Sequence, residues 1–263
     1  MTSEAPAALG RAWVPEFRRL VAAVGVVLWL LCLVPPMTSW SHRYEFAESI
    51  QFAVLGFWVP ALLAVGAPWQ RWRLVRVDES GGISGGVLHE RRRVNQGRAL
   101  SFASLFIAIS IFWRLAPIVN GLTDHEWIVV VEALTLTGAG VALMCDVVES
   151  PPLRPGVSRP YRIGLSAAVM WSAWVFAYLE AMSHAPWYRA FQHVAGRSLS
   201  MPADQQLSAA SVWFMTGVVF VPIIYWNLVH WLQAEEDPDD ELYKMVRQER
   251  SRGFFGYRSD DSI

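Results

Sequence analysis

The sequence is poor in charged residues and in cysteine. Only 17% of its 263 residues are Asp, Glu, Lys or Arg, and it contains 2 cysteines. Soluble domains usually carry about a quarter charged residues, so this composition argues against a water-soluble globular protein. Cys32 and Cys145 both fall inside apolar runs. Two cysteines placed in this way do not favour a disulfide framework or a thiolate metal cluster.

Motifs that would indicate an enzyme are missing. The chain has no nucleophile elbow, no HExxH sequence, no dinucleotide fingerprint and no pair of intramembrane histidines suited to holding haem. The four glycines at 81, 82, 85 and 86 are not followed by the Lys and Ser/Thr of a P-loop, which favours a turn. A formal net charge of −1 gives no sign of nucleic-acid binding. We therefore expect a protein that is not an enzyme.

Long apolar runs and tryptophan are abundant. Hydrophobic residues make up 54% of the chain, which contains 14 tryptophans. An apolar run of about 20 residues is long enough to cross a bilayer as a helix, and tryptophan near its ends suits the headgroup region. The sequence predicts an all-α, polytopic membrane helical bundle of about six transmembrane helices. The predicted spans are 20–40, 49–69, 99–122, 127–147, 163–183 and 207–231.

The distribution of basic residues predicts the orientation. Arginines collect before the first run, after the second, after the fourth and beyond the sixth, whereas the other connections contain fewer. Short cytoplasmic loops hold the excess of Lys and Arg, so we expect both termini in the cytoplasm. The predicted organisation is an N-terminal cytoplasmic segment at 1–19, a transmembrane domain at 20–232 with a cytoplasmic loop at 70–98, and a cytoplasmic polar tail at 233–263.

Several ionisable residues stand within or beside the apolar runs. A charge facing lipid at the centre of a helix costs about 2.5 to 3.5 kcal/mol, so such residues require partners or a function. In the predicted orientation Arg114 and Glu132 occupy the outer half of neighbouring helices, and Glu48 and Glu180 lie at similar depth. We expect a buried ion-pair network of one cation and up to three carboxylates.

Histidines in the predicted outer connections form a second candidate site. His125, His184 and His193 accompany several acidic residues there. Imidazole and carboxylate groups bind transition metals, but these residues lack the spacing of a helical ligand pair or a short metal motif. Ordinary solvated loop residues are the alternative interpretation.

Three segments carry a family resemblance. Asp204, Gln205 and Gln206 precede the last run, the segment 185–188 reads APWY, and the segment 60–68 reads PALLAVGAP. These segments resemble those of the CtaG family of cytochrome c oxidase assembly factors, both in their order along the chain and in the side of the membrane on which they are predicted to lie. Gln51 matches a further family position, in a motif whose two histidines would stand at 48 and 52.

The resemblance implies a protein that works with a copper-containing oxidase. Members of the family are polytopic proteins implicated in copper delivery, and histidines in their helices are taken to be the ligands. Here those positions hold Glu48, Phe52, Arg114 and Glu132. A guanidinium or a phenyl ring cannot donate a lone pair to copper as an imidazole can. We therefore expect the ordinary copper site to be absent and the network of Glu48, Arg114, Glu132 and Glu180 to occupy its place. In that network we expect Arg114 to form hydrogen-bonded ion pairs with Glu48 and Glu132.

The expected function is that of an integral membrane accessory or assembly protein of a haem-copper cytochrome c oxidase. Its expected location is the bacterial inner (plasma) membrane, and its expected partners are lipids and subunits of a respiratory complex. No cofactor is expected, with copper as the alternative. Two other functions stay open: copper delivery through other ligands, and a permanent structural subunit of another respiratory or energy-transducing complex. A transporter is disfavoured because the runs show no pair of broken helices in matching halves.

Overall fold

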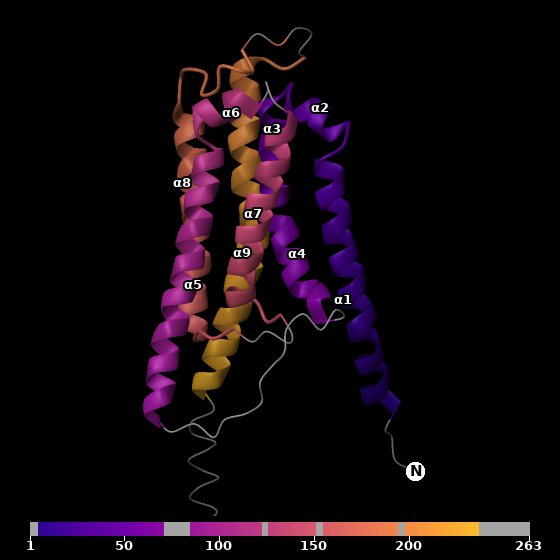
Figure 1. Ribbon diagram of the computed structural model, residues 1–263, viewed down its shortest axis with the longest axis vertical. Helices are drawn as coiled ribbons and strands as arrows, with labels where there is room; N and C mark the ends of the chain where they lie inside the picture. Colours follow the sequence, from indigo (N-terminus) through magenta and orange to yellow (C-terminus); the bar gives the residue numbers. More distant parts are fainter. Residues whose placement is uncertain are drawn as a thin grey trace, which may run out of the picture.

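The structure, a computed structural model, describes residues 5–70, 85–122, 126–150, 155–192, 194 and 198–236. These residues form an elongated bundle of helices (Figure 1), which confirms the all-helical prediction. Its helices, in chain order, are α1 Ala5–Cys32, α2 Met37–Ser41, α3 Glu45–Ala53, α4 Val59–Gly66, α5 Gly85–Trp113, α6 Ala116–Leu122, α7 Glu126–Val147, α8 Arg159–Met182 and α9 Met201–Glu236.

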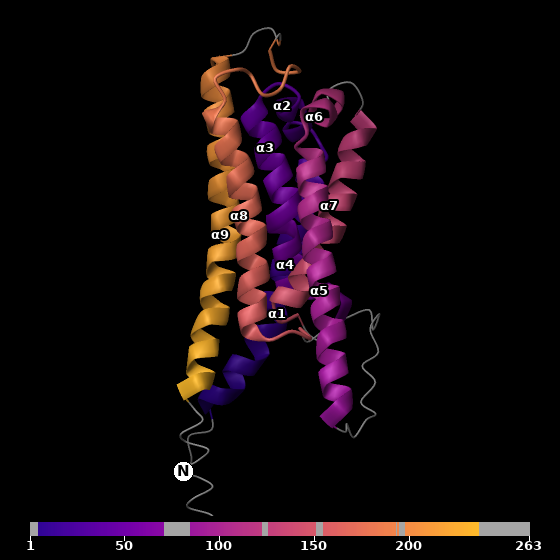
Figure 2. The ribbon, with the colours of Figure 1, turned by 90° about the vertical axis from the view of Figure 1, so that its left-hand side faces the viewer.

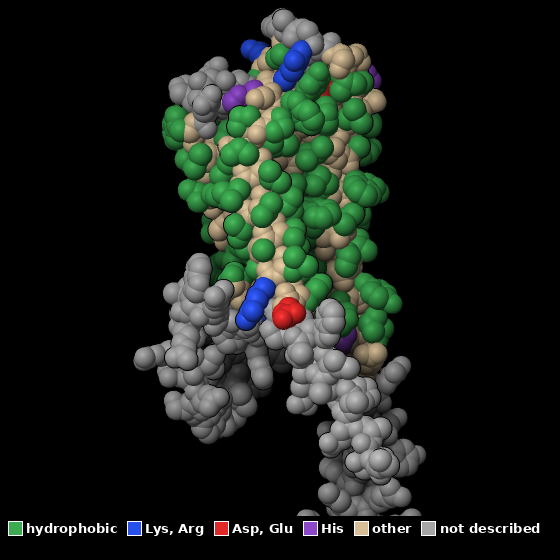
Figure 3. Space-filling view, turned by 90° about the vertical axis from the view of Figure 1, so that its right-hand side faces the viewer, with side chains coloured by type: hydrophobic (Ala, Val, Ile, Leu, Met, Phe, Trp, Pro, Cys, Tyr) green, Lys and Arg blue, Asp and Glu red, His purple; other side chains and the backbone are tan. Residues whose placement is uncertain are grey.

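Five segments of the described chain are long and apolar enough to cross a membrane. They are Glu45–Gly66, Asn95–Trp113, Trp127–Val147, Arg159–Met182 and Met201–Gln233. Large apolar side chains cover the outside of the bundle between its two ends (Figure 3), as expected where lipid is the solvent. The chain is therefore a multi-pass membrane protein.

The first predicted span is divided. Helix α1 ends at Cys32, and α2 begins only at Met37, after the cis peptide bond between Pro35 and Pro36. Proline lacks the backbone N–H that a continuous helix needs, so the run 20–40 could not form one helix. The apolar part of α1 still runs beside α4, so α1 is a sixth long helix of the bundle (Figure 1).

The second predicted span contains a local change of helix type. A π-helical turn at Val54–Trp58 joins α3 to α4. Because such a turn alters the backbone hydrogen-bonding pattern, neighbouring side chains can serve its carbonyl groups. The hydroxyl of Thr137 on α7 donates to the carbonyl of Leu55 at 3.1 Å. The span ends at Ala67, whose φ of 45° closes α4 in the left-handed conformation.

Helix α9 organises one side of the bundle. It packs against α8 along its length and against α3 on another face, and α8 and α9 lie side by side in Figure 2. On the other side α7 packs against α4 and α5. The interior between these helices contains a group of aromatic rings in which Phe57 makes edge contacts with Phe52, Phe106 and Phe220.

The two ends of the described chain lie at the same end of the bundle. Helix α1 begins and α9 ends there (Figures 1 and 2), in agreement with an even number of crossings. The structure describes the predicted loop 70–98 only in part. Its residues 85–98 form the first turns of α5. Most of the predicted tail 233–263 lies outside the described residues.

Candidate functional site

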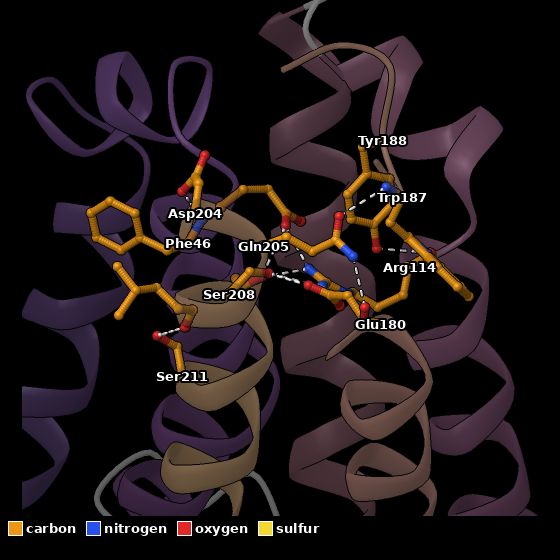
Figure 4. Close-up of polar contacts among 12 residues, drawn as sticks. Phe46, Arg114, Glu180, Trp187, Tyr188, Asp204, Gln205, Ser208 and Ser211 are labelled. Carbon is orange, nitrogen blue, oxygen red and sulfur yellow. Dashed lines mark hydrogen bonds and ion pairs between the residues drawn. The ribbon is translucent and has the colours of Figure 1, made fainter. Parts of the chain in front are cut away.

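A buried arginine joins three helices near the end of the bundle opposite to the chain termini. Arg114 follows the last residue of α5, and only 3% of its surface is exposed. Its Nη1 donates to Glu48 Oε2 at 2.5 Å and to Ser49 Oγ at 2.8 Å, both on α3. Its Nη2 donates to Glu180 Oε2 on α8 at 2.5 Å and to Ser208 Oγ on α9 at 3.4 Å (Figure 4). One guanidinium therefore connects α5 with α3, α8 and α9.

The hydroxyl groups complete this arrangement. Ser208 also donates to the second carboxylate oxygen of Glu180, and the hydroxyl oxygens of Ser49 and Ser208 lie 2.5 Å apart. The rings of Phe52 and Tyr188 lie 5.5 and 5.3 Å from the guanidinium carbon of Arg114. Hydrogen bonds in the plane of the guanidinium and aromatic rings near it are both favourable surroundings for a desolvated arginine.

Two further carboxyl groups lie close to this network. Glu132 on α7 and Glu45 on α3 are 3% and 4% exposed, and each has an Oε1 atom with no hydrogen-bond partner in the described part of the chain. Glu132 interacts electrostatically with Glu48 and Arg114. Together with Glu48 and Glu180, these residues place four carboxyl groups around one guanidinium. Protons or a cation must offset the excess of acidic over basic groups, because uncompensated charge is costly in an apolar interior.

The structure brings the sequence-predicted network residues together with one difference in pairing. We expected Arg114 to pair with Glu48 and Glu132, whereas its two charged partners are Glu48 and Glu180. Glu132 lies beside the cluster without a hydrogen bond to it in the described residues. The four positions at which the resemblance places histidines, 48, 52, 114 and 132, thus surround a single point between α3, α5 and α7.

A small cavity borders the guanidinium. It has a volume of about 20 Å³ and is lined by Arg114, Ser110, Ser172 and apolar side chains. Arg114 Nε and Ser110 Oγ are both buried and lack partners among the described residues. The space is sufficient for about one water molecule.

The residues that carried the family resemblance hold helix ends in place. Asp204 accepts hydrogen bonds from the backbone N–H groups of Glu45 and Phe46 at 3.0 and 3.1 Å (Figure 4). It therefore caps the N-terminus of α3 from a different helix, α9. Backbone N–H groups in the first turn of a helix have no partner within that helix, and they favour a negative charge.

Gln205, the next residue of the motif, forms hydrogen bonds at the C-terminal end of α8. Its Nε2 donates to the carbonyl groups of Glu180 and Ser183 at 2.7 and 3.2 Å, and its Oε1 accepts from the N–H of Trp187 at 3.1 Å. Gln206 is exposed and lines a groove between α8 and α9. Two of the three residues in the motif thus hold helix ends, Asp204 the start of α3 and Gln205 the end of α8, and the third does not.

Gln51 and Tyr188 have the same kind of role. Gln51 Nε2 donates to the carbonyl of Cys32 at the end of α1, at 2.6 Å. The fully buried phenol of Tyr188 donates to the carbonyl of Arg114 at 3.0 Å. Burial raises the pKa of the Tyr188 phenol well above its usual value, so the hydroxyl stays protonated and remains a donor.

The structure does not assemble the histidines of the outer connections into a site that can be described. His184 is exposed, and a ring nitrogen lies 3.0 Å from the carbonyl of Met182. His125 and His193 lie outside the described residues. Within the described ranges, no group of three or more His, Cys, Asp or Glu side chains could hold a metal ion.

Sequence reasoning missed three members of the cluster. Ser49 and Ser208 contact the guanidinium, yet serine within an apolar run is too common to indicate a site. Glu45 is one of the acidic residues that the sequence places in an outer connection, whereas in the structure it lies buried on α3 beside the cluster. A signal was present in Glu45 and Glu48, which are three residues apart and therefore share a helix face.

Comparison with known proteins identifies the family of the chain. Residues 3–234 match the sequence model of a family described as cytochrome c oxidase caa3 assembly factor, CtaG. Comparisons with curated proteins and with solved structures find no match. Because the family match covers most of the 263 residues, this chain belongs to the caa3 cytochrome c oxidase assembly factor family.

Proposed function

We propose that this chain assists the assembly of a haem-copper cytochrome c oxidase through contacts with oxidase subunits, without carrying copper between its helices. Membership of an oxidase assembly factor family supports the first part of the proposal. The position of Arg114 supports the second part, and it is the observation on which the proposal depends. The proposed role is non-catalytic, and the proposed location is the bacterial inner membrane with both termini in the cytoplasm.

The side chains at this point are poorly suited to binding a metal. The guanidinium of Arg114 has no lone pair to donate, and both of its terminal nitrogens are bonded to carboxylate oxygens, those of Glu48 and Glu180. A copper ion would have to displace these bonds and to lie close to a fixed positive charge. Phe52, a further family histidine position, contributes only its ring. The ion pairs therefore occupy the place of a metal and hold the helices together.

The experiment is an affinity purification of the full-length protein from native membranes in a mild detergent. Co-purifying subunits and copper content are measured on the same sample. We expect oxidase subunits to co-purify, with copper well below one atom per chain. Deletion of the gene for this chain should lower the amount of assembled oxidase, measured from its haem absorbance. Expression of the wild-type chain in the deletion strain should restore that amount.

The two open alternatives give different results. About one copper per chain, retained through purification, would contradict the proposal and support copper delivery through other ligands. Stoichiometric presence of the chain in mature, active oxidase would instead identify a permanent subunit. Co-purification with a different respiratory complex, together with unchanged oxidase in the deletion strain, would reject the oxidase role.

A further inference from the structure

An open groove lies at the end of the bundle where α1 begins, far from the Arg114 cluster. It has a volume of about 640 Å³, and α1, α4, α7, α8 and α9 contribute to its walls. Ligand sites in proteins usually have volumes of this size. None of the residues described above as part of the cluster lines it.

The groove exists because α1 touches α4 closely at one level and diverges from the bundle beyond it. Gly66 on α4 lies so close to Ala22 that an added Cβ would be 2.6 Å from the Ala22 backbone nitrogen. Toward its N-terminus α1 leans away from α9 (Figure 1). The resulting wedge is bordered by Val21 and Phe17 on α1 and by Pro222 and Trp226 on α9.

The walls of the groove are mainly apolar over a length that matches one leaflet. On α9 the lining residues run from Val218 to Asn227, a rise of about 14 Å at 1.5 Å per residue. Half of the hydrocarbon core of a bilayer is about 15 Å thick. An acyl chain of a single leaflet therefore fits along this wall, with its headgroup at the end of the groove.

Basic side chains stand at that end. Arg18 of α1 and Arg162 of α8 both line the groove, together with Glu149. Arg162 also donates to the carbonyl groups of Val157 and Pro155, which fixes its position, and its Nη1 lies 3.8 Å from Glu149. No ion pair of Arg18 is present in the described residues. The end of the groove thus presents positive charge next to an apolar wall.

We propose that this groove is a binding site for an anionic glycerophospholipid, with an acyl chain along α4 and α9 and its phosphate at Arg18 and Arg162. Basic pockets between membrane helices bind anionic headgroups by charge attraction, while apolar walls take the chains. A peptide segment would need partners for its backbone groups, and the walls offer few polar atoms. The lipid supplies both the negative charge and the apolar length that the groove accommodates.

The test is native mass spectrometry of the full-length protein in an uncharged detergent, titrated with phosphatidylglycerol or with phosphatidylcholine of the same chains. We expect tighter binding of phosphatidylglycerol. Arg18→Gln should weaken that binding by about fivefold, as expected for one basic residue near a headgroup. Arg19→Gln is the matched control, because Arg19 is the neighbouring residue, is exposed and does not line the groove. It should change the affinity by less than about twofold.

A second variant tests the apolar wall independently. Val65 lines the groove and is 37% exposed, so Val65→Trp can fill the space without disturbing the core. It should weaken the binding of both lipids, whereas Leu134→Trp, at an exposed site elsewhere, should not. Equal affinity for the two lipids, equal effects of the two arginine variants, or unchanged binding in Val65→Trp would each overturn the proposal.

Discussion

Arg114 depends on partners from three helices, so its contribution cannot be assigned to any one of them. Its side chain and that of Glu180 are 3% and 0% exposed, and Glu48 is 7% exposed. A buried ion pair need not be more stable than an apolar core of the same shape, because both charges lose their hydration. Removal of one member is costly for a different reason: it leaves the others buried and unpaired.

We therefore expect Arg114→Ala to lower the free energy of unfolding by about 3 to 5 kcal/mol. The measurement is thermal unfolding in detergent. Arg159→Ala is the control, because Arg159 pairs at 3.5 Å with Glu149, whose side chain is 62% exposed, and should cost less than about 1 kcal/mol. Arg114→Met combined with Glu48→Gln and Glu180→Gln should recover part of the loss. Equal stability of Arg114→Ala and wild type would reject the structural role of the network.

Charges inside apolar runs could be predicted from the sequence, but their pairing could not. Arg114, Glu48 and Glu180 are conspicuous because ionisable residues are rare in membrane helices. Which carboxylate meets Nη2 depends on the rotation of α7 and α8 about their axes, and periodicity alone does not fix that rotation relative to a neighbour. For this reason the sequence predicts a hydrogen bond from Arg114 to Glu132, whereas in the structure that bond goes to Glu180.

At the scale of the helix, residues of the family motif form hydrogen bonds with backbone groups at helix ends. Asp204 caps α3 with two hydrogen bonds from backbone N–H groups. We expect Asp204→Ala to cost about 0.5 to 2 kcal/mol, the usual loss on removal of an N-terminal cap. Gln206→Ala, an exposed residue of the same motif, should stay within about 0.5 kcal/mol. Equal effects in thermal unfolding would show that the capping bonds do not stabilise the fold.

Close contact between α7 and the α3–α4 span gives a second test at this scale. A Cβ at Gly140 would lie 2.5 Å from Pro60 Cγ and 2.9 Å from the carbonyl oxygen of Gly56, whereas a Cβ at Gly138 would meet nothing within 4 Å. Gly140→Ala should therefore destabilise by about 1 to 3 kcal/mol through overpacking. Gly138→Ala, two residues away on the same helix, should be neutral or stabilising by up to about 1 kcal/mol. The pair is compared by thermal unfolding, and equal midpoints would contradict this packing.

Hydropathy predicts which segments form helices, but it does not predict where a helix is interrupted. The runs 127–147 and 163–183 correspond to α7 and α8 within a few residues. The runs 20–40 and 99–122 each contain a break, after Cys32 and after Trp113. A run of apolar residues shows only that a segment can lie in lipid. Local backbone chemistry, here Pro35–Pro36 and Pro117, decides where the helix ends.

In the whole molecule the two ends differ in chemistry. The acidic cluster and Arg114 lie at the end where α3 and α9 begin, and the basic groove lies at the end where α1 begins. Anionic lipids are concentrated in the cytoplasmic leaflet of membranes. The Lys and Arg excess on the connections at the groove end predicts that this end faces the cytoplasm. Orientation therefore links the lipid site to the leaflet that supplies the lipid.

Cysteine labelling in intact cells tests that orientation. In a background with Cys32→Ala and Cys145→Ala, Ser198→Cys places a thiol at the cluster end, and Gln233→Cys places one near the end of α9; both positions are exposed. We expect a membrane-impermeant maleimide to label Ser198→Cys in intact cells and Gln233→Cys only after permeabilisation. The reverse pattern would place the termini outside. It would also put the basic groove in the outer leaflet, away from the leaflet in which anionic lipids are concentrated.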